Sequence, residues 1–442
     1  METIENKKEE RKFPQSITMK GIIVFVLTLI LLIPGEMVQD LIRERKSRSI
    51  ETVNKINDKW SNAQTICGPV LTIPYSLVFV EKNKQTTEQH ELHLFPETLN
   101  MKTQLHPEVK YYGIYKTILY KSDIRVSGKF EKKNLVSDEN VIYHFDKATI
   151  AIGVSDLRGV TNQIDFNING KTYQADAGGR DSNFGDKLVF QLNDLLKKSE
   201  MEELSFDCNL NLNGSSCINF IPVGKNTQVS VDGAWTSPGF VGSFSPESQI
   251  TNDGFSATWN ILHFNRNIPE FYNDNNVDSF YDASFGVNLV DTVDHYQQNT
   301  RAAKYALMFI ALTFVVFFFV ELITKRKIHP IQYLLVGIAL ILFYSLLLSI
   351  SEQINFGIAY LIASIATVGL IGGYASSIFK NKKQTATLTV MLCSLYTFLY
   401  VILQLEDVAL LIGSIGLFVI LGIIMYFSRK ITWYKEIKEE EK

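Results

Sequence analysis

The sequence lacks the short motifs that identify common catalytic centres. Its 442 residues contain no Gly-x-Ser-x-Gly, no phosphate-binding P-loop and no His-Glu-x-x-His. These motifs present a nucleophile, cradle a phosphate or bind zinc. Cysteine and histidine are scarce as well, with 4 and 7 residues in the whole chain. These absences exclude the enzyme classes that such motifs define, and they favour a protein that does not catalyse a reaction.

Six long stretches contain few charged residues. The first covers residues 17–35, and the others centre on 303–323, 331–350, 356–379, 385–403 and 408–427. Each approaches the ~20 apolar residues that a helix needs to cross ~30 Å of hydrocarbon. A soluble helix would show a polar face, whereas FIALTFVVFFFVELI is apolar on all sides. The sequence therefore predicts six transmembrane helices, one near the start and five in the last third.

Positive charge is missing from every second short loop between these helices. Lys and Arg in short loops mark the cytoplasmic side of a membrane protein. The basic loops follow helices two, four and six, and the acidic turns follow helices three and five. This alternation predicts that both termini are cytoplasmic and that residues 40–300 lie outside. The basic residues are Lys325, Arg326, Lys327, Lys380, Lys382, Lys383, Arg429 and Lys430, and the acidic ones are Glu352, Glu406 and Asp407.

A signal-peptidase site is not evident after the first apolar stretch. Its core, residues 21–33, has the length found in signal peptides, so a cleaved signal peptide is the alternative to a membrane anchor. The following residues, PGEMV at 34–38, offer no small-x-small cleavage site, and an amphipathic segment continues the chain. We expect an uncleaved anchor.

The region between the first two apolar stretches is polar and has the alternation of β-strands. Alternating apolar and polar side chains indicate a sheet with one buried face. We expect an antiparallel sandwich or barrel-like fold of one large domain or two. Helices are predicted at 36–60 and 190–204, and a loop at 270–282. The candidate strands are 70–80, 91–95, 147–154, 187–192, 227–233 and 256–264.

Two Asn-Gly pairs are candidate hairpin turns, because a type I′ turn needs positive φ at both central residues. Residues 169–170 are the stronger candidate and residues 213–214 the second. Cys208 and Cys217 flank the second pair, and with a tip at 213–214 their sulfurs lie diagonally rather than opposite. An oxidising compartment permits a disulfide, and the sequence leaves open whether these two cysteines are bridged.

Clusters of metal ligands and cofactor motifs are not evident either. His90 and His93 are three residues apart on a predicted strand and so point to opposite faces. Asp291, Asp294 and His295 could form a metal cluster, but without another His or Cys nearby a solvated loop is favoured. We therefore expect no metal site, no cofactor and no nucleic-acid partner.

The predicted membrane helices carry no charge at their centres, which disfavours an ion-coupled transporter. Glu321 and Glu352 lie at helix ends, where we expect their carboxylates to reach water. Small residues four apart, at 369 and 373 and at 409 and 413, predict close packing of helices. Cys393 is interpreted as a small packing residue within its helix.

Polar residues gather where the outer region returns to the membrane. Arg301 and Lys304 lie within one helical turn of each other, near the level of lipid headgroups, and Asp294 and Tyr296 precede them. These four residues are the candidate functional residues of the chain. The alternative is interfacial anchoring, a common role of Tyr and Lys at this depth.

Several segments resemble the inner membrane protein CreD family. The longest is VDHYQQNTRAAKYALMFIALTFVVFFFVELITKRKIHPIQYLLVGIALILFYSLLLSISEQINF at 293–356. GPVLTIPY (68–75), LFPETL (94–99), GIYKTILYKSDIRVSGKF (113–130), GVSDLRGV (153–160) and WTSPGFVGSFSP (235–246) add to it, so the resemblance spans nearly the whole chain. It implies a bacterial inner membrane protein linked to cell envelope integrity and to a two-component stress regulon. It supplies no reaction, ligand or active site.

These observations combine into an α+β membrane protein with a large, mainly antiparallel β domain between transmembrane helices one and two. The expected parts are a cytoplasmic tail (1–16), helix one (17–35), a periplasmic β-rich domain (36–300), a five-helix bundle (301–427) and a second cytoplasmic tail (428–442). The favoured function is non-enzymatic support of the envelope, through binding of a protein, a lipid or a cell-wall component. The alternative is a membrane-embedded enzyme or carrier for envelope lipid intermediates. The sequence does not indicate an oligomeric state.

Overall fold

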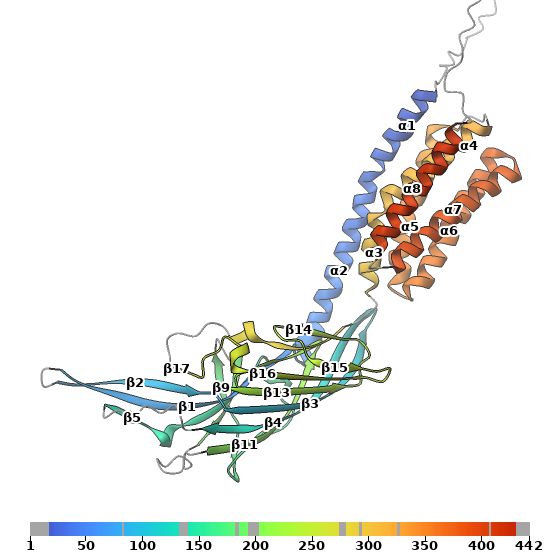
Figure 1. Cartoon of the computed structure of the whole chain (residues 1–442). Helices are drawn as coiled ribbons and strands as arrows, with labels where there is room; N and C mark the ends of the chain where they lie inside the picture. The colour runs from blue at the N-terminus through green and yellow to red at the C-terminus, as the bar shows by residue number, and fades with distance from the viewer. Residues whose placement is uncertain are drawn as a thin grey trace, which may run out of the picture. The chain divides into compact units, whose positions relative to one another are not determined.

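The computed structural model describes residues 17–81, 84–131, 140–181, 185–192, 203–273, 280–290, 294–324, 328–405 and 408–429 of the 442. The chain forms two compact units, residues 1–48 with 293–442 and residues 49–292. The first unit is helical, and the second is built mainly from strands (Figure 1). The boundary falls inside helix α2 (Leu32–Trp60).

Two mixed sheets make up the β unit. In the described residues the larger sheet has ten strands and the smaller one eight. The strands along the larger sheet follow the order β14 (Pro238–Gly242), β18 (Phe285–Leu289), β12 (Cys217–Ile221), β1 (Gln64–Glu81), β6 (Thr149–Val154), β10 (Gly185–Gln191), β9 (Asp176–Asp181). Three more strands extend this sheet: β2 (Lys84–Leu94) and β5 (Val141–Tyr143) pair with β1, and β17 (Phe271–Asn273) pairs with β2. The smaller sheet has the order β15 (Glu247–Ile250), β16 (Phe255–Leu262), β13 (Asn226–Gly233), β3 (Thr98–Tyr112), β4 (Tyr115–Glu131), β11 (Glu203–Ser215), β7 (Asp165–Ile168), β8 (Lys171–Gln174).

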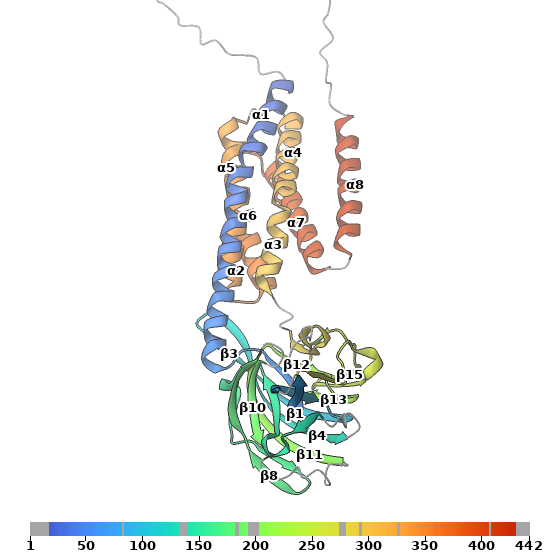
Figure 2. The same cartoon turned by 90° about the vertical axis from the view of Figure 1, so that its left-hand side faces the viewer.

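The two sheets share one apolar core, which gives the β unit the character of a sandwich (Figure 2). Phe166 of β7 lies against Phe190 of β10 with ring centroids 4.9 Å apart. Trp259 of β16 meets Phe285 of β18 at 5.2 Å. Most strand pairs are antiparallel, but β1 pairs in parallel with β12, and β13 with β3. All six predicted strands are confirmed. Alternation places one face of strands such as β13 and β16 in this core, whereas β6 is buried on both faces.

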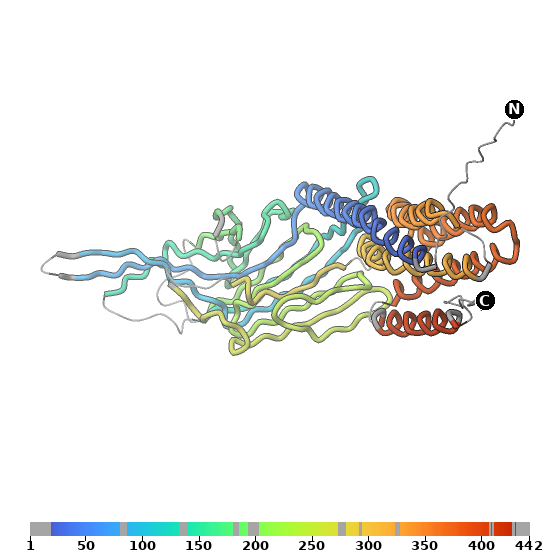
Figure 3. Tube along the Cα trace, turned by 90° about the horizontal axis from the view of Figure 1, so that it is seen from above, coloured from blue at the N-terminus to red at the C-terminus, as the bar shows by residue number. Residues whose placement is uncertain are grey.

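A long ribbon extends from the larger sheet. β1 and β2 remain paired from Leu71 opposite Leu94 to Glu81 opposite Lys84, and Figure 3 shows the two strands side by side. The predicted helix at 190–204 lies mostly outside the described residues, and its two ends belong to β10 and β11. The predicted loop at 270–282 begins with β17 and ends in a short 3-10 helix.

Only one of the two predicted hairpins exists. Asn169 and Gly170 have φ of 46° and 83° and join the antiparallel strands β7 and β8, as predicted. The second prediction is wrong, because Asn213 and Gly214 continue β11 and pair with Lys121 and Tyr120 of β4. The chain turns instead at residue 216, which has a φ of 59°.

Cys208 and Cys217 are not bridged. Both are free thiols, and they belong to strands of different sheets, β11 and β12. Burial raises the pKa of Cys208 to about 12 and that of Cys217 to about 11. Both thiols are therefore protonated at neutral pH and poorly reactive.

The helical unit contains α1 (Ile17–Ile30), the first part of α2, α3 (His295–Lys304), α4 (Ala306–Thr324), α5 (Pro330–Ser351), α6 (Phe356–Phe379), α7 (Lys382–Gln404) and α8 (Ala409–Ser428). α1 contacts α4 and α5 (Figure 2). Among the described residues, four helices are long and apolar enough to cross a membrane, or five if the pair α3–α4, bent by 46°, forms one span. The apolar part of α8, Leu411–Tyr426, is shorter. The predicted helix at 36–60 is confirmed as part of α2.

The predicted packing role of the small residues in α6 is wrong for Gly369 and Gly373. A Cβ atom added at either position would meet nothing within 4 Å. Gly372 instead faces α7, where an added Cβ would lie 3.0 Å from the hydroxyl oxygen of Thr389. Cys393, also expected to pack, is exposed. The spacing of small residues does not reveal which side of the helix has a neighbour.

A buried polar cluster holds the end of α2 within the β unit. Gln64 donates from its side-chain amide to the Ser61 hydroxyl at 2.8 Å and to the backbone carbonyls of Asp156 at 2.9 Å and Asn213 at 3.2 Å. The Asp156 carboxylate accepts from Arg158 at 2.7 and 2.9 Å. These hydrogen bonds lower the pKa of Asp156 to about 2. Charge-assisted hydrogen bonds therefore fix the segment 153–160 beside the start of β1.

We expect Asp156→Asn to lower the free energy of unfolding of the full chain by about 2 kcal/mol at pH 7. A carboxyl group with a lowered pKa stabilises the fold only where it is ionised. The deficit should therefore shrink below about pH 4 and nearly vanish at pH 2, the pKa of the folded-state carboxyl. Denaturant titrations in detergent across this pH range, followed by tryptophan fluorescence, measure it. The exposed residue Asp146 provides the control, Asp146→Asn. A loss of unfolding free energy that is the same at every pH would show that the ionised form of Asp156 is not what stabilises the fold.

Candidate functional site

The four candidate residues lie on α3 and just before it. Asp294 caps the helix, and its carboxylate accepts hydrogen bonds from the backbone N–H groups of Tyr296 at 2.9 Å and Gln297 at 3.1 Å. Lys46 of α2 places its Nζ 3.6 Å from the same carboxylate. Asp294 thus has the partners of a helix cap stabilised by a cation.

Tyr296 points into the helical unit and is 5% exposed. Its hydroxyl donates to Oε1 of Glu352 at 3.1 Å, and the guanidinium of Arg45 lies 3.9 Å from Oε2 of the same carboxylate. Asn299, one turn after Tyr296, donates to the hydroxyl of Ser351 at 2.7 Å. These contacts connect α2, α3 and the end of α5.

The other two candidates lie at the end of α3 opposite to Asp294. Arg301 is half-buried and Lys304 is exposed, both in the last turn of α3. Sequence reasoning missed Arg45, Lys46 and Glu352 as partners of the cap and the tyrosine. The only hint in the sequence is that Arg45 and Lys46 form a basic pair after the first apolar stretch. That pair does not reveal which acidic residues of other helices lie next to it.

Glu321 and Glu352 do not reach water as predicted, since their side chains are 4% and 9% exposed. Glu321 forms an ion pair with Lys20 of α1. It also accepts hydrogen bonds from the hydroxyl of Tyr333 at 2.9 Å and the backbone N–H of Ile328 at 3.1 Å. The prediction was wrong because position near a helix end does not show whether a neighbouring helix covers that end. Both carboxylates have donors around them and act as structural links.

A different group of polar side chains covers the outer side of the eight-stranded sheet. Alternate residues of its central strands enter the core, and the residues between them form rows across five strands. We call two of these rows the polar face. The first row is Thr258, Ser230, Lys102, Arg125 and Asn209, and the second is Ser256, Asp232, Gln104, Asp123 and Asn211.

The polar face is hollowed, with a cavity of ≈ 400 Å³ above β13, β3, β4 and β11. Asn211 donates to Asp123 at 2.5 Å, and Arg125 lies 3.0 Å from Asp207. Lys102 belongs to no ion pair among the residues that the structure describes. Amides, hydroxyls, carboxylates and two cations thus border one cavity, which suits a ligand with many hydroxyl and amide groups.

No arrangement in the described ranges corresponds to a metal centre, because no three His, Cys, Asp or Glu side chains gather there. Asp294 and His295 are neighbours in the chain, whereas Asp291 lies outside the described residues. His93 stacks on Tyr272 with ring centroids 4.4 Å apart, and His90 stacks on Tyr75 at 5.5 Å. These two histidines have aromatic partners in the β unit.

Comparison with known proteins identifies a family. The model of the family described as inner membrane protein CreD matches residues 16–434. Inner membrane protein CreD of Escherichia coli (strain K12) is 31% identical over 421 residues, which cover 93% of this chain and 92% of that protein.

Two solved structures that match this chain are much less similar to it. The M1 zinc metallopeptidase from Deinococcus radiodurans is 10% identical, with 44% of this chain and 42% of that chain covered and a TM-score of 0.22. A substrate-bound mutant of that enzyme gives 9% identity, 48% and 53% coverage and a TM-score of 0.21. Sequence identities and TM-scores this low indicate neither the fold nor the activity of this chain.

We expect Glu321→Leu to destabilise the helical unit by about 3–5 kcal/mol, because it leaves Lys20 with its charge uncompensated in a largely buried position. The double variant Lys20→Met, Glu321→Leu should recover most of that loss, because no charge remains. Thermal unfolding of the full chain in detergent compares the two. If the double variant is as unstable as Glu321→Leu alone, the ion pair is not what these residues contribute.

Proposed function

This chain belongs to the CreD family of inner membrane proteins, and we propose on this basis that it supports the cell envelope by binding an envelope component without catalysing a reaction. The β unit provides the binding surface, and the helices hold it at the bilayer. The ligand that we propose is the glycan of the cell wall, and the role in envelope stress implied by the family resemblance follows from that binding.

The polar face is the observation that supports this proposal. Glycan strands expose hydroxyl groups and N-acetyl amides, which pair with the amide, carboxylate and hydroxyl side chains of its two rows. A cavity of ≈ 400 Å³ lies within the size range of ligand sites. A sheet places these groups on a rigid support, because the same strands bury their alternate residues in the core.

The proposed arrangement in the membrane has six spans. A cytoplasmic tail (1–16) precedes span one (17–35), a periplasmic region follows (36–300), and a five-helix bundle (301–427) leads to a second cytoplasmic tail (428–442). The basic loops support this orientation. An enzyme or carrier for lipid intermediates, the alternative function, is less well supported, because Glu321 and Glu352 already have partners within the chain.

We expect Arg125→Ala to weaken binding of the full-length protein to purified peptidoglycan sacculi about tenfold, because a charged hydrogen-bond donor contributes ~1.5–3 kcal/mol. Lys102→Ala should act in the same direction. Co-sedimentation of the detergent-solubilised protein with sacculi measures the binding.

The control is Lys171→Ala, an exposed lysine of the same sheet on β8, outside the polar face. This variant should bind like the unchanged protein. If Arg125→Ala and Lys102→Ala bind the sacculi as well as Lys171→Ala does, the ligand binds to another surface and not to the polar face.

The orientation is tested by alkaline phosphatase, which folds only where its disulfides can form. An insertion after Gly113, an exposed residue in the turn between β3 and β4, should give an active enzyme. A fusion after Lys442 should be inactive, while a green fluorescent protein fused there should fluoresce. The reverse pattern would overturn the proposed orientation.

A further inference from the structure

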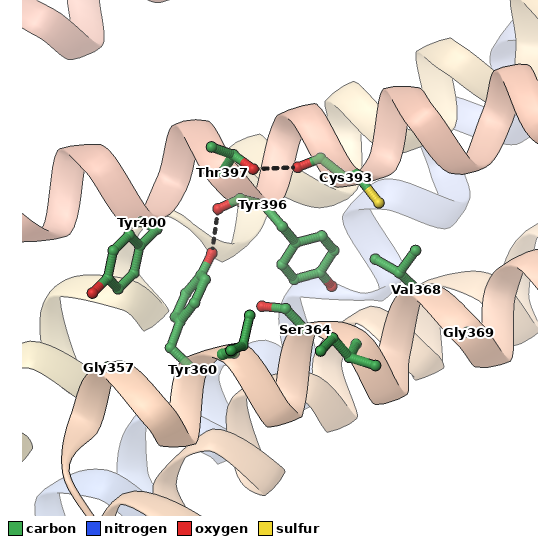
Figure 4. A pocket seen from close by; sticks show the side chains of 11 residues that line it. Gly357, Tyr360, Ser364, Val368, Gly369, Cys393, Tyr396, Thr397 and Tyr400 are labelled. Carbon is green, nitrogen blue, oxygen red and sulfur yellow. Dashed lines mark hydrogen bonds between the residues drawn. The ribbon is translucent and has the colours of Figure 1, made fainter.

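A groove runs between α6 and α7 in the helical unit. It encloses ≈ 590 Å³, and Figure 4 shows the side chains that line it. Three tyrosines, Tyr360, Tyr396 and Tyr400, contribute to its wall, and Ser364 and Cys393 also line it. None of the described residues that line the groove is charged, so they offer no counter-ion to a ligand with a charged head group.

The length of the groove corresponds to about one leaflet of a bilayer. Its residues on α6 extend from Gly357 to Gly369 along one helical face, a rise of ~18 Å. Asn355 caps α6, so the groove begins at the first turn of the helix and ends near its middle. Half of the hydrocarbon core is ~15 Å thick. An elongated apolar molecule from one leaflet would therefore fit along it.

Among the described residues, two buried hydroxyl groups in this groove have no hydrogen-bond partner of good distance and angle, although Tyr360 lies near the first and Thr367 near the second. They are Oγ of Ser364 and the phenolic oxygen of Tyr396, on residues that are 8% and 3% exposed. Figure 4 shows both side chains directed into the space between the two helices. The hydroxyl of Tyr360, by contrast, donates to the backbone carbonyl of Tyr396 at 2.7 Å.

A buried hydroxyl without a partner costs about 1–3 kcal/mol, and a lipid environment offers no water to compensate. Ser364 lies eight residues into α6, which places it ~12 Å along the helix. The acyl chains of a bilayer carry no hydrogen-bond acceptor at such a depth. They could fill the groove but would leave both hydroxyls unpaired.

We propose that the groove binds a prenyl quinone, a neutral membrane-soluble molecule with a flat ring and carbonyl oxygens. The carbonyl oxygens accept hydrogen bonds from Ser364 and Tyr396. The ring lies among the tyrosine side chains, and the apolar tail follows the α6 face. This site lies in the helical unit and is independent of the proposed glycan binding by the β unit.

The test uses a decylubiquinone that carries a diazirine, with the full-length protein in nanodiscs of dioleoylphosphatidylglycerol and dioleoylphosphatidylethanolamine. Illumination should label peptides of α6 and α7, and excess unlabelled decylubiquinone should prevent it. Tyr396→Phe and Ser364→Ala should each raise the half-blocking concentration about fivefold, the equivalent of one hydrogen bond.

Two glycines of α6 provide a matched pair. Gly369 lines the groove and Gly373 does not, while an added Cβ meets nothing within 4 Å at either position. Gly369→Leu should abolish most of the labelling, and Gly373→Leu should leave it unchanged. Equal labelling of the two variants, or labelling that decylubiquinone does not block, would mean that bilayer acyl chains occupy the groove and would overturn the proposal.

Thermal unfolding separates binding from folding. Since the Tyr396 hydroxyl forms no hydrogen bond of good geometry with the described residues, although Thr367 lies near it, Tyr396→Phe should not lower the unfolding temperature in the absence of quinone. A lower temperature would show that the hydroxyl is used structurally and would contradict the site. A protein that does not bind glycan but is still labelled by the quinone would contradict only the proposed function of the β unit. The two proposals can therefore be refuted independently.

Discussion

Hydrogen bonding without water is the constraint on which this structure depends. An apolar environment leaves a polar group to find its partners within the protein, and an isolated charge there is costly. Glu321 meets the constraint with an ion pair to Lys20 and two further donors, the Tyr333 hydroxyl and the Ile328 amide. The attraction within this pair offsets part of the cost of burying both charges. These contacts join α1, α4 and α5, and they make a carboxylate a link between helices rather than an ion-binding group.

The same constraint operates in the β unit. Arg266 is 7% exposed, and its guanidinium donates to the backbone carbonyls of Val223, Gly224 and Ile268. Burial lowers the pKa of Arg266 to about 10, so the group keeps its charge at neutral pH. This buried arginine is tolerated because carbonyl dipoles converge on it and the charge of Glu270 also favours its charged form. Chain segments far apart in the sequence are thereby fixed around one side chain.

Local patterns in the sequence predicted the strands well, because alternation and burial are properties of a few neighbouring residues. They failed where a distant segment decides the outcome. Gly214 stays in a strand because it pairs with Tyr120 of β4, and a glycine is needed there because the Tyr120 ring would lie 2.3 Å from a Cβ. The Tyr120 hydroxyl then donates to the carbonyl of Cys217 at 2.8 Å, just beyond the real turn. An Asn-Gly pair predicts a turn only if no opposing strand continues past it.

The candidate sites show the same division between local and distant information. Alternation predicts that one side of each strand is polar, but register decides that Lys102 and Arg125 stand opposite each other and form one surface. Small residues in α6 predicted a helix contact, whereas two of them face open space and one of those lines the groove. Sequence alone cannot show that the hydroxyls of Ser364 and Tyr396 form no hydrogen bond of good geometry with the described residues, because that depends on every helix around them. Other buried polar atoms, such as the Tyr344 hydroxyl, are also unpaired, so it is the position of Ser364 and Tyr396 beside a cavity that points to a missing ligand.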